Sequence, residues 1–187
     1  MHQDDRLVEI TGERHQVVID LAYARPGNLT GRTLYATNCC LLHREAEPAL
    51  RRAAAMAALC GLRLKLLDAY RPPQAQELLW RSLPDPRYVA EAGRGSNHSR
   101  GVALDVTLVD AEGVELDMGT PFDAMVELAH HLAPGLPAEV QRNRFILLGI
   151  MVLAGFREID SEWWHYELPE ARTFPLLRDD RVECHGD

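Results

Sequence analysis

The stretch SNHSRGVALDV, residues 96–106, places a histidine in a polar segment and an aspartate inside an apolar run. His98 stands in the polar part, and Asp105 follows seven residues later. Residues 102–109 predict a strand. Burying a carboxylate among apolar side chains costs free energy unless a counter-charge or hydrogen bonds compensate for it. We therefore expect Asp105 to have a partner elsewhere in the chain.

The composition is that of an ordinary globular protein. The chain has 187 residues, of which 47% are hydrophobic and 26% are charged. This length can bury a core without disulfides, and we expect one domain over residues 1–187. The net charge of −8 at pH 7 argues against nucleic acid and anionic membranes as partners, because both require clustered positive charge.

The sequence predicts a cytoplasmic protein with free thiols. Its first residues, MHQDDRLVEI, are charged from the start and lack the apolar stretch of a signal peptide. No run approaches the roughly 18 apolar residues that span a bilayer. No C-x-x-C spacing occurs, so we expect neither disulfides nor a cysteine zinc site. The cysteines are Cys39, Cys40, Cys60 and Cys184.

In the first half of the chain, hydrophobic periodicity and the positions of glycine and proline predict strands and helices in turn. The expected elements are a strand over residues 15–23, a helix over 45–60 ending at Gly61, a strand over 62–67, and a helix over 74–82 after Pro72 and Pro73.

In the second half, Gly93 and Gly95 open the loop that carries His98. The order of elements does not repeat a strand-helix-strand unit, so we expect an α+β fold with a central antiparallel sheet and flanking helices. The elements expected here are a strand over 102–109, a turn over 110–113, a helix with Phe122, Met125, Val126 and Ala129 on one face, a second helix with Phe145, Leu148, Gly149 and Val152 on one face, a stop at Gly155, and closing strands in FREI and EWWHYEL.

Two histidines and an aspartate are candidate metal ligands. Histidine and carboxylate ligands on separate elements suit zinc, and a catalytic zinc site keeps three protein ligands and one open position. His98, Asp105 and His165 would form such a set, and the metal would supply the counter-charge that Asp105 needs. A His–Asp pair at this spacing also occurs as a plain hydrogen bond, so both interpretations are open at this point.

Glu162 lies three residues before His165. On a regular strand the two side chains would point to opposite faces, so a joint role requires Glu162 at a bend, which residues 160–161 favour. A glutamate there can take a proton from water and deliver it to a leaving amine. The alternative is a surface carboxylate. The neighbouring Trp163 and Trp164 are expected in the core and the pocket wall.

Arg71 is expected at the end of a strand, just before two prolines. Its fixed charge and fork of donors would suit a developing oxyanion or a substrate carboxylate. An ion pair with Asp68 is the structural alternative, and the residues alone do not separate the two.

The segments around these residues resemble a known family. SNHSRGVALDVTL has the form of the SxHxxGxAxD motif, and SEWWHYE that of the ExxWH-type ending, of the zinc D,D-peptidases of family M15. Within that family, the chain is most similar to the D-alanyl-D-alanine dipeptidases of the VanX type. The similarity runs from Asp20 to Leu168 and includes DLAYARPGNLTG, CCLLHREA, DAYRPPQAQ, DMGTPFD and QRNRFILLGIM in the family's order.

The resemblance implies a compact D,D-peptidase (hedgehog-like) α+β fold and hydrolysis of a small D,D-dipeptide, D-Ala-D-Ala. It implies one Zn²⁺ per chain, Glu162 as general base and acid, and Arg71 as the group that stabilises the tetrahedral intermediate. The zinc ligands that it implies are His98, Asp105 and His165.

The resemblance also implies three substrate contacts. Asp123 would face the free amino group, Ser96 would help to hold the carboxylate end, and Tyr23 would form part of the pocket wall. An N-acylated or longer peptide lacks the ammonium group and would leave Asp123 unpaired, which is costly in a closed site.

Two other functions are open. One is a D,D-carboxypeptidase or endopeptidase that acts on muropeptides, against which the lack of an export signal argues. The other is a zinc-binding module without catalysis, against which Glu162 and Arg71 argue.

Overall fold

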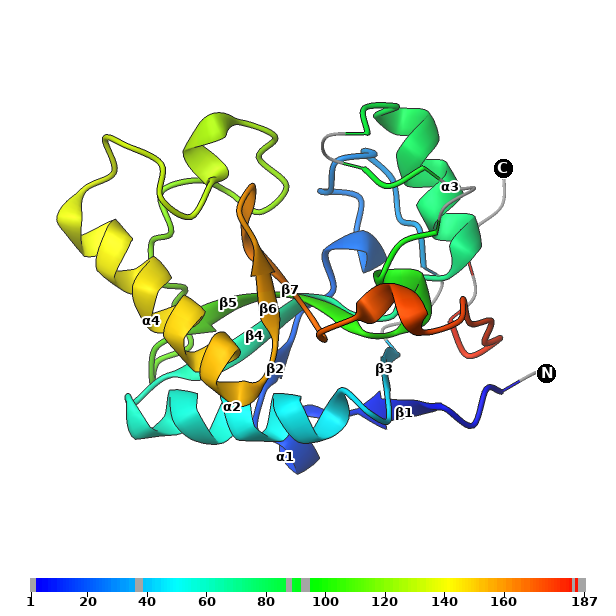
Figure 1. The fold of residues 1–187 in the computed structure, drawn as a ribbon, viewed down its shortest axis with the longest axis horizontal. Helices are drawn as coiled ribbons and strands as arrows, with labels where there is room; N and C mark the ends of the chain where they lie inside the picture. Colours follow the sequence, from blue (N-terminus) through cyan, green and yellow to red (C-terminus); the bar gives the residue numbers. More distant parts are fainter. Residues whose placement is uncertain (1–2, 36–38, 87–88, 92–94, 183, 185–187) are drawn as a thin grey trace.

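A five-stranded sheet lies at the centre of the protein, in the strand order β2-β4-β5-β7-β6 (Figure 1). The strands β2 and β4 pair in parallel, and the other neighbours pair antiparallel. A smaller antiparallel sheet joins β1 and β3. The strands are β1 (Leu7–Ile10), β2 (Val18–Ile19), β3 (Cys40–His43), β4 (Arg63–Asp68), β5 (Ala103–Val109), β6 (Arg157–Ile159) and β7 (Glu162–Glu167).

The computed structural model describes residues 3–35, 39–86, 89–91, 95–182 and 184. In this part of the chain the helices are α1 (Gly12–His15), α2 (Glu47–Leu59), α3 (Pro73–Ser82) and α4 (Ala138–Ala154), with short 3₁₀ turns η1 (Ala22–Ala24), η2 (His98–Arg100), η3 (Glu127–Ala129) and η4 (Ala171–Thr173). Within the described ranges, no helix combines the length and the apolar character needed to cross a membrane.

The main core lies between the sheet and the helix pair α2 and α4, which pack side by side (Figure 1). All seven residues of β5 are buried, as suits a central strand covered on both faces. The buried side chains of α2 are mostly alanine: Ala49, Leu50, Ala53, Ala54 and Ala57. Arg52 of α2 donates two hydrogen bonds to the carbonyl of Ala154, which links the end of α4 to α2.

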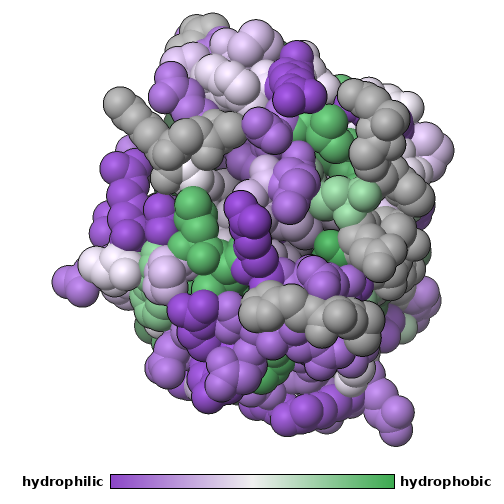
Figure 2. Space-filling view, turned by 90° about the vertical axis from the view of Figure 1, so that its right-hand side faces the viewer, coloured by the Kyte–Doolittle hydropathy of each residue, from purple (hydrophilic) through white to green (hydrophobic). Residues whose placement is uncertain are grey.

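A second hydrophobic cluster lies under α3 and includes Leu41, Tyr70 and Leu79. The face of the molecule that carries α3 is mostly hydrophilic, and its hydrophobic residues form small separate groups (Figure 2). The site described below lies between α3 and the sheet.

The α+β expectation is confirmed, and most expected elements are present within a residue or two of their predicted bounds. All four cysteines are free, as expected. Gly93 lies outside the described residues. The strand expected over residues 15–23 is mostly wrong, because only Val18–Ile19 pairs with β4, and the chain then turns through η1.

The helix expected around Phe122–Ala129 is wrong. Only Glu127–Ala129 form a 3₁₀ turn, and the rest of the segment is irregular. Asp123 has a φ of 60°, which no α-helix accommodates. The carbonyls of Leu128 and His130, at the end of the segment, accept hydrogen bonds from the side chain of Arg144 on α4. Tertiary contacts therefore override the apolar spacing.

The helix α4 is present, but its expected buried face is wrong. Phe145 and Val152 are 50% and 43% exposed, respectively. The buried side chains are instead Val140, Arg144, Leu147, Ile150, Met151 and Ala154. Apolar residues occur all round α4, so their spacing did not identify the inward face, and the buried Arg144 would be assigned to solvent by its charge.

Gly101 permits the close turn between η2 and β5, and we expect Gly101→Ala to be more destabilising than Gly61→Ala. Both glycines have a φ of 70°, which costs about 1–2 kcal/mol for any other residue. A Cβ at Gly101 would also lie 2.7 Å from Leu7 Cδ2 and 3.2 Å from the backbone nitrogen of His43, whereas at Gly61 nothing lies within 4 Å.

We expect this overpacking to add about 1–3 kcal/mol to the loss at Gly101. Urea denaturation of the two variants measures the difference in unfolding free energy. Equal losses of unfolding free energy in the two variants would show that the neighbours of Gly101 move aside without cost.

Candidate metal centre and active site

Strand register brings two of the predicted ligands together. In the antiparallel pair of β5 and β7, Asp105 lies directly opposite His165. Residues paired in this way point to the same face of the sheet, so the carboxylate and the imidazole meet. The Oδ1 atom of Asp105 is 3.0 Å from Nδ1 of His165. On the other side of β5, Asp68 of β4 pairs with Asp105.

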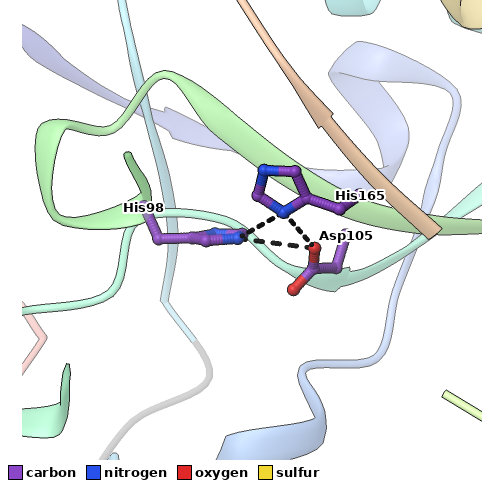
Figure 3. Close-up of side chains that lie close together, drawn as sticks. All are labelled: His98, Asp105 and His165. Atoms are coloured by element: carbon purple, nitrogen blue, oxygen red, sulfur yellow. Dashed lines mark hydrogen bonds and ion pairs between the residues drawn. The ribbon is translucent and has the colours of Figure 1, made fainter. Parts of the chain in front are cut away.

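The third predicted ligand, His98, comes from η2, shortly before β5. Its Nε2 atom is 3.2 Å from Nδ1 of His165 and 3.4 Å from Oδ1 of Asp105. Figure 3 shows the three side chains pointing toward one another. All three are buried, and their ligand atoms lie within 4.8 Å of one another. The His–Asp hydrogen bond and the three-ligand set, both open on the sequence alone, are therefore both present.

The tautomers of the two histidines suit a metal ion. His98 Nδ1 is 2.8 Å from the carbonyl oxygen of Ala69, which can only accept, so Nδ1 carries the proton and Nε2 presents a lone pair. His165 Nε2 is 3.3 Å from Oε2 of Glu167, which leaves Nδ1 as the inward-facing nitrogen. Such outer hydrogen bonds are typical of metal-binding histidines.

The spacing of the donor atoms also suits zinc. Ligands about 2.0–2.1 Å from a tetrahedral zinc lie about 3.3 Å from one another. The three donor atoms of this cluster are separated by 3.0, 3.2 and 3.4 Å. Two imidazoles and one carboxylate are a common ligand set for a catalytic zinc ion. The residues present therefore fit the metal.

The cluster stabilises positive charge. Burial alone would lower the pKa of His165, but its hydrogen bonds with Asp105 and Glu167 raise that pKa to about 10. Burial would likewise raise the pKa of Asp105, but its interactions with His98 and its hydrogen bond with His165 hold that pKa well below its usual value. A cation between these side chains thus meets a favourable potential.

A cavity of about 300 Å³ opens beside the cluster. It collects seven of the eight predicted site residues, and the eighth, Asp105, is buried next to two of them. The predicted residues in the lining are Tyr23, Arg71, Ser96, His98, Asp123, Glu162 and His165.

Glu162 lies at the bend that the sequence indicated. It is the first residue of β7, and the pairing of β6 with β7 shifts register between Glu158 and Ile159. This irregularity breaks the strand alternation, so Glu162 and His165 line one cavity although they are three residues apart. Burial raises the pKa of the Glu162 carboxyl above its ordinary value, and the negative charge of Asp105 adds to this effect. A raised pKa suits a group that both accepts and releases a proton.

Arg71 forms the ion pair with Asp68 that the sequence left open. Its Nε and Nη2 atoms lie 2.8 and 2.6 Å from Oδ2 of Asp68, and Nη1 donates to Oε1 of Gln76 at 2.9 Å. These bonds use three of the five N–H donors of a guanidinium. Arg71 also lines the cavity, with its guanidinium carbon 4.8 Å from the ring centre of Tyr23. The ion pair thus fixes Arg71 in the wall of the cavity.

The remaining predicted residues, Tyr23, Asp123 and Ser96, also line the cavity. The Tyr23 hydroxyl donates to Oδ2 of Asp123 at 2.8 Å. Burial, together with the charge of Asp105, raises the pKa of Asp123 to about 7, although the hydrogen bond from Tyr23 opposes this shift. The Oγ atom of Ser96 accepts a hydrogen bond from the backbone nitrogen of His98 at 3.2 Å. Ser96 therefore supports a ligand residue as well as lining the cavity.

Sequence reasoning missed the residues that orient this site. Glu167 contacts His165 and also accepts a hydrogen bond from Asn97 at 2.7 Å. Its position two residues after His165, on the same face of a strand, was an available signal. Gln76, which holds Arg71, and the carbonyl of Ala69, which orients His98, gave no signal because their contacts depend on the tertiary fold.

Comparison with known proteins shows the family of the chain. The family model described as D-Ala-D-Ala dipeptidase, a peptidase family of class M15, matches residues 3–186. The chain is 48% identical over 179 residues to the D-alanyl-D-alanine dipeptidase of Escherichia coli (strain K12), covering 96% of this chain and 93% of that protein. It is 35% identical over 175 residues to the D-alanyl-D-alanine dipeptidase of Enterococcus faecalis (strain ATCC 700802 / V583), covering 82% and 87%, respectively. The chain therefore belongs to the M15 peptidase family of D-Ala-D-Ala dipeptidases.

Proposed function

We propose that this peptidase hydrolyses D-Ala-D-Ala to two D-alanines in a zinc-dependent reaction. The observation that carries the proposal is the buried set of His98, Asp105 and His165 at the edge of a cavity that also contains Glu162. The names of the similar proteins support the substrate, and the donor set supports the metal.

A zinc ion held by the three ligands would polarise the scissile carbonyl and acidify an attacking water. Glu162 takes the proton from that water as it attacks the carbonyl carbon. Once the tetrahedral intermediate has formed, Glu162 delivers the proton to the leaving amine. Its buried position supports this role, because a carboxylate in an apolar setting binds a proton more readily than one in water.

Arg71 stabilises the negative charge that develops on the carbonyl oxygen. Asp68 and Gln76 hold the guanidinium in place before substrate arrives, so no reorganisation is needed at the transition state. The N–H groups that these partners do not use are the ones available to an oxyanion.

The residues that bind the two ends of the dipeptide determine the substrate length that the cavity accepts. Asp123, oriented by Tyr23, pairs with the free ammonium group, and the Ser96 hydroxyl binds the terminal carboxylate. An N-acylated peptide has no ammonium and leaves Asp123 without its partner, so we expect poor turnover of such peptides. A cavity of about 300 Å³ is at the small end of ligand sites, which supports a dipeptide as substrate.

Removal of the metal should abolish activity. We expect a chelator to stop release of D-alanine from D-Ala-D-Ala, and one equivalent of Zn²⁺ to restore it. A muramyl pentapeptide assayed in parallel should be cleaved far more slowly. Full activity of metal-free protein would refute the zinc dependence, and faster cleavage of the pentapeptide would favour a carboxypeptidase.

Glu162→Gln should lower kcat by about 10²- to 10⁴-fold, because the amide cannot accept the proton of the attacking water. Zinc content should be unchanged, since Glu162 is not among the three ligands. Steady-state kinetics together with metal analysis measure both quantities. The matched control is Glu158→Gln, an exposed glutamate on β6 four residues earlier. A Glu162→Gln variant with wild-type kcat would remove Glu162 from the mechanism.

The KM for D-Ala-D-Ala should rise as the pH falls below about 7. Asp123 has a pKa of about 7 in the free protein, and only its ionised form, present above that pH, pairs with the ammonium group. Below that pH the rise should approach about tenfold per pH unit. In Asp123→Asn, KM should be higher and should lose this dependence between pH 5.5 and 7. If the KM of Asp123→Asn still rose in the same way as the pH falls below about 7, another group would be responsible for the titration.

A further inference from the structure

Arg144 is a buried arginine without an acidic partner. It is 1% exposed, and no carboxylate pairs with it among the residues that the structure describes. Its hydrogen bonds go to three backbone carbonyls: Nε to Met118 at 2.8 Å, Nη1 to His130 at 2.7 Å and Nη2 to Leu128 at 2.9 Å. Burying a guanidinium costs free energy, so this arrangement calls for an explanation beyond core packing.

The three carbonyls lie at the two ends of one loop. We call residues 118–130 the Asp123 loop, because Asp123 lies in its middle and lines the cavity. Met118 is at one end of the loop, and Leu128 and His130 are at the other. A single guanidinium on α4 thus joins the two ends.

Two neighbouring side chains of α4 also hold the ends of this loop, and we call these contacts together with those of Arg144 the clamp. Asn143 donates to the carbonyl of Asp117 at 2.9 Å, and Gln141 donates to that of His131 at 3.1 Å. Gly119 packs so closely on α4 that an added Cβ would lie 2.8 Å from Cγ1 of Val140. The ends of the loop are therefore fixed to a rigid helix.

Two further contacts hold the part of the Asp123 loop that lies between its fixed ends. Trp163, whose ring centre is 6.0 Å from the Arg144 guanidinium carbon, donates to the hydroxyl of Thr120 at 2.9 Å. At the tip, Asp123 adopts a φ of 60° and accepts the hydrogen bond from Tyr23. A non-glycine residue in this conformation persists only where its surroundings hold it.

We propose that Arg144 is a positioning residue for substrate recognition: by clamping the ends of the Asp123 loop, it holds the Asp123 carboxylate where the ammonium group of the dipeptide binds. The inference rests on the proposed function, in which Asp123 pairs with that group. A residue of α4, a helix that does not line the cavity, would therefore affect both the affinity for the dipeptide and the discrimination against N-acylated peptides.

The test is a double-mutant cycle between Arg144 and Asp123, with zinc content and far-UV circular dichroism checked for each variant. Arg144→Met keeps the length and apolar stem of the side chain but removes every donor. We expect KM for D-Ala-D-Ala to rise about tenfold, with kcat changed less than KM. The preference for D-Ala-D-Ala over its N-acetyl derivative should fall in proportion. In the Asp123→Ala background, Arg144→Met should change KM by less than about twofold, because the group through which it acts is gone.

The matched control is Arg142→Met, an exposed arginine two residues earlier on α4, which should have wild-type KM and selectivity. If Arg144→Met does not fold, the double variant Asn143→Ala/Gln141→Ala loosens the same loop ends without burying a new group. It should raise KM in the same direction, and wild-type KM in that variant would overturn the inference.

The outcomes separate the two proposals. If Asp123→Ala leaves KM unchanged, the role of Asp123 in the proposed function fails. If Asp123→Ala raises KM but Arg144→Met lowers only kcat, or multiplies KM equally in both backgrounds, the positioning role of Arg144 fails while the proposed function stands.

Discussion

Asp105 is a carboxylate on a buried central strand, held between two imidazoles, and this contact constrains much of the architecture. The register of β5 against β7 must place Asp105 opposite His165, since a slip of one residue would turn the carboxylate to the other face of the sheet. The turn at Gly101 must bring His98 back over the start of β5. Outer partners then fix the imidazoles: the carbonyl of Ala69 for His98 and Glu167 for His165. The site is therefore a product of sheet pairing more than of any single loop.

The polar groups of the cavity fall into two sets that the fold supports in different ways. The candidate metal ligands and Arg71 lie on or close to β4, β5 and β7, which form the centre of the sheet. Asp123 belongs to an irregular segment that depends on side-chain hydrogen bonds from α4. In the proposed mechanism, the residues that carry the chemistry therefore lie on regular structure, whereas the residue that binds the amino group of the substrate lies on a loop whose ends are fixed to α4. This division agrees with the general tendency of binding residues to lie on loops that a scaffold positions.

The sequence predicted the strands of the site well because their signals are local. The apolar run around Asp105, the leucine alternation before Arg71 and the turn residues before Glu162 each indicate their element without tertiary information. The face of α4 was not predictable in this way, because Phe145 and Val152 are as apolar as the buried Leu147 and Ile150, and burial of Arg144 depends on carbonyls remote in sequence. The Asp123 loop was mistaken for a helix for the same reason. The resemblance to a known family predicted Asp123 and Ser96 as site residues, whereas the spacing of residues in the sequence did not.

The hairpin of β6 and β7 carries both Glu162 and His165, and β6 is an edge strand with a register shift beside it. β7, in contrast, pairs with β5 on its other side, and Trp163, Trp164 and Tyr166 of this strand belong to the main core. Opening of this hairpin would move Glu162 and His165 out of the cavity in one event and would expose these core side chains. In the proposed mechanism, loss of the metal and loss of catalysis would then coincide with exposure of the main core during unfolding by heat or denaturant.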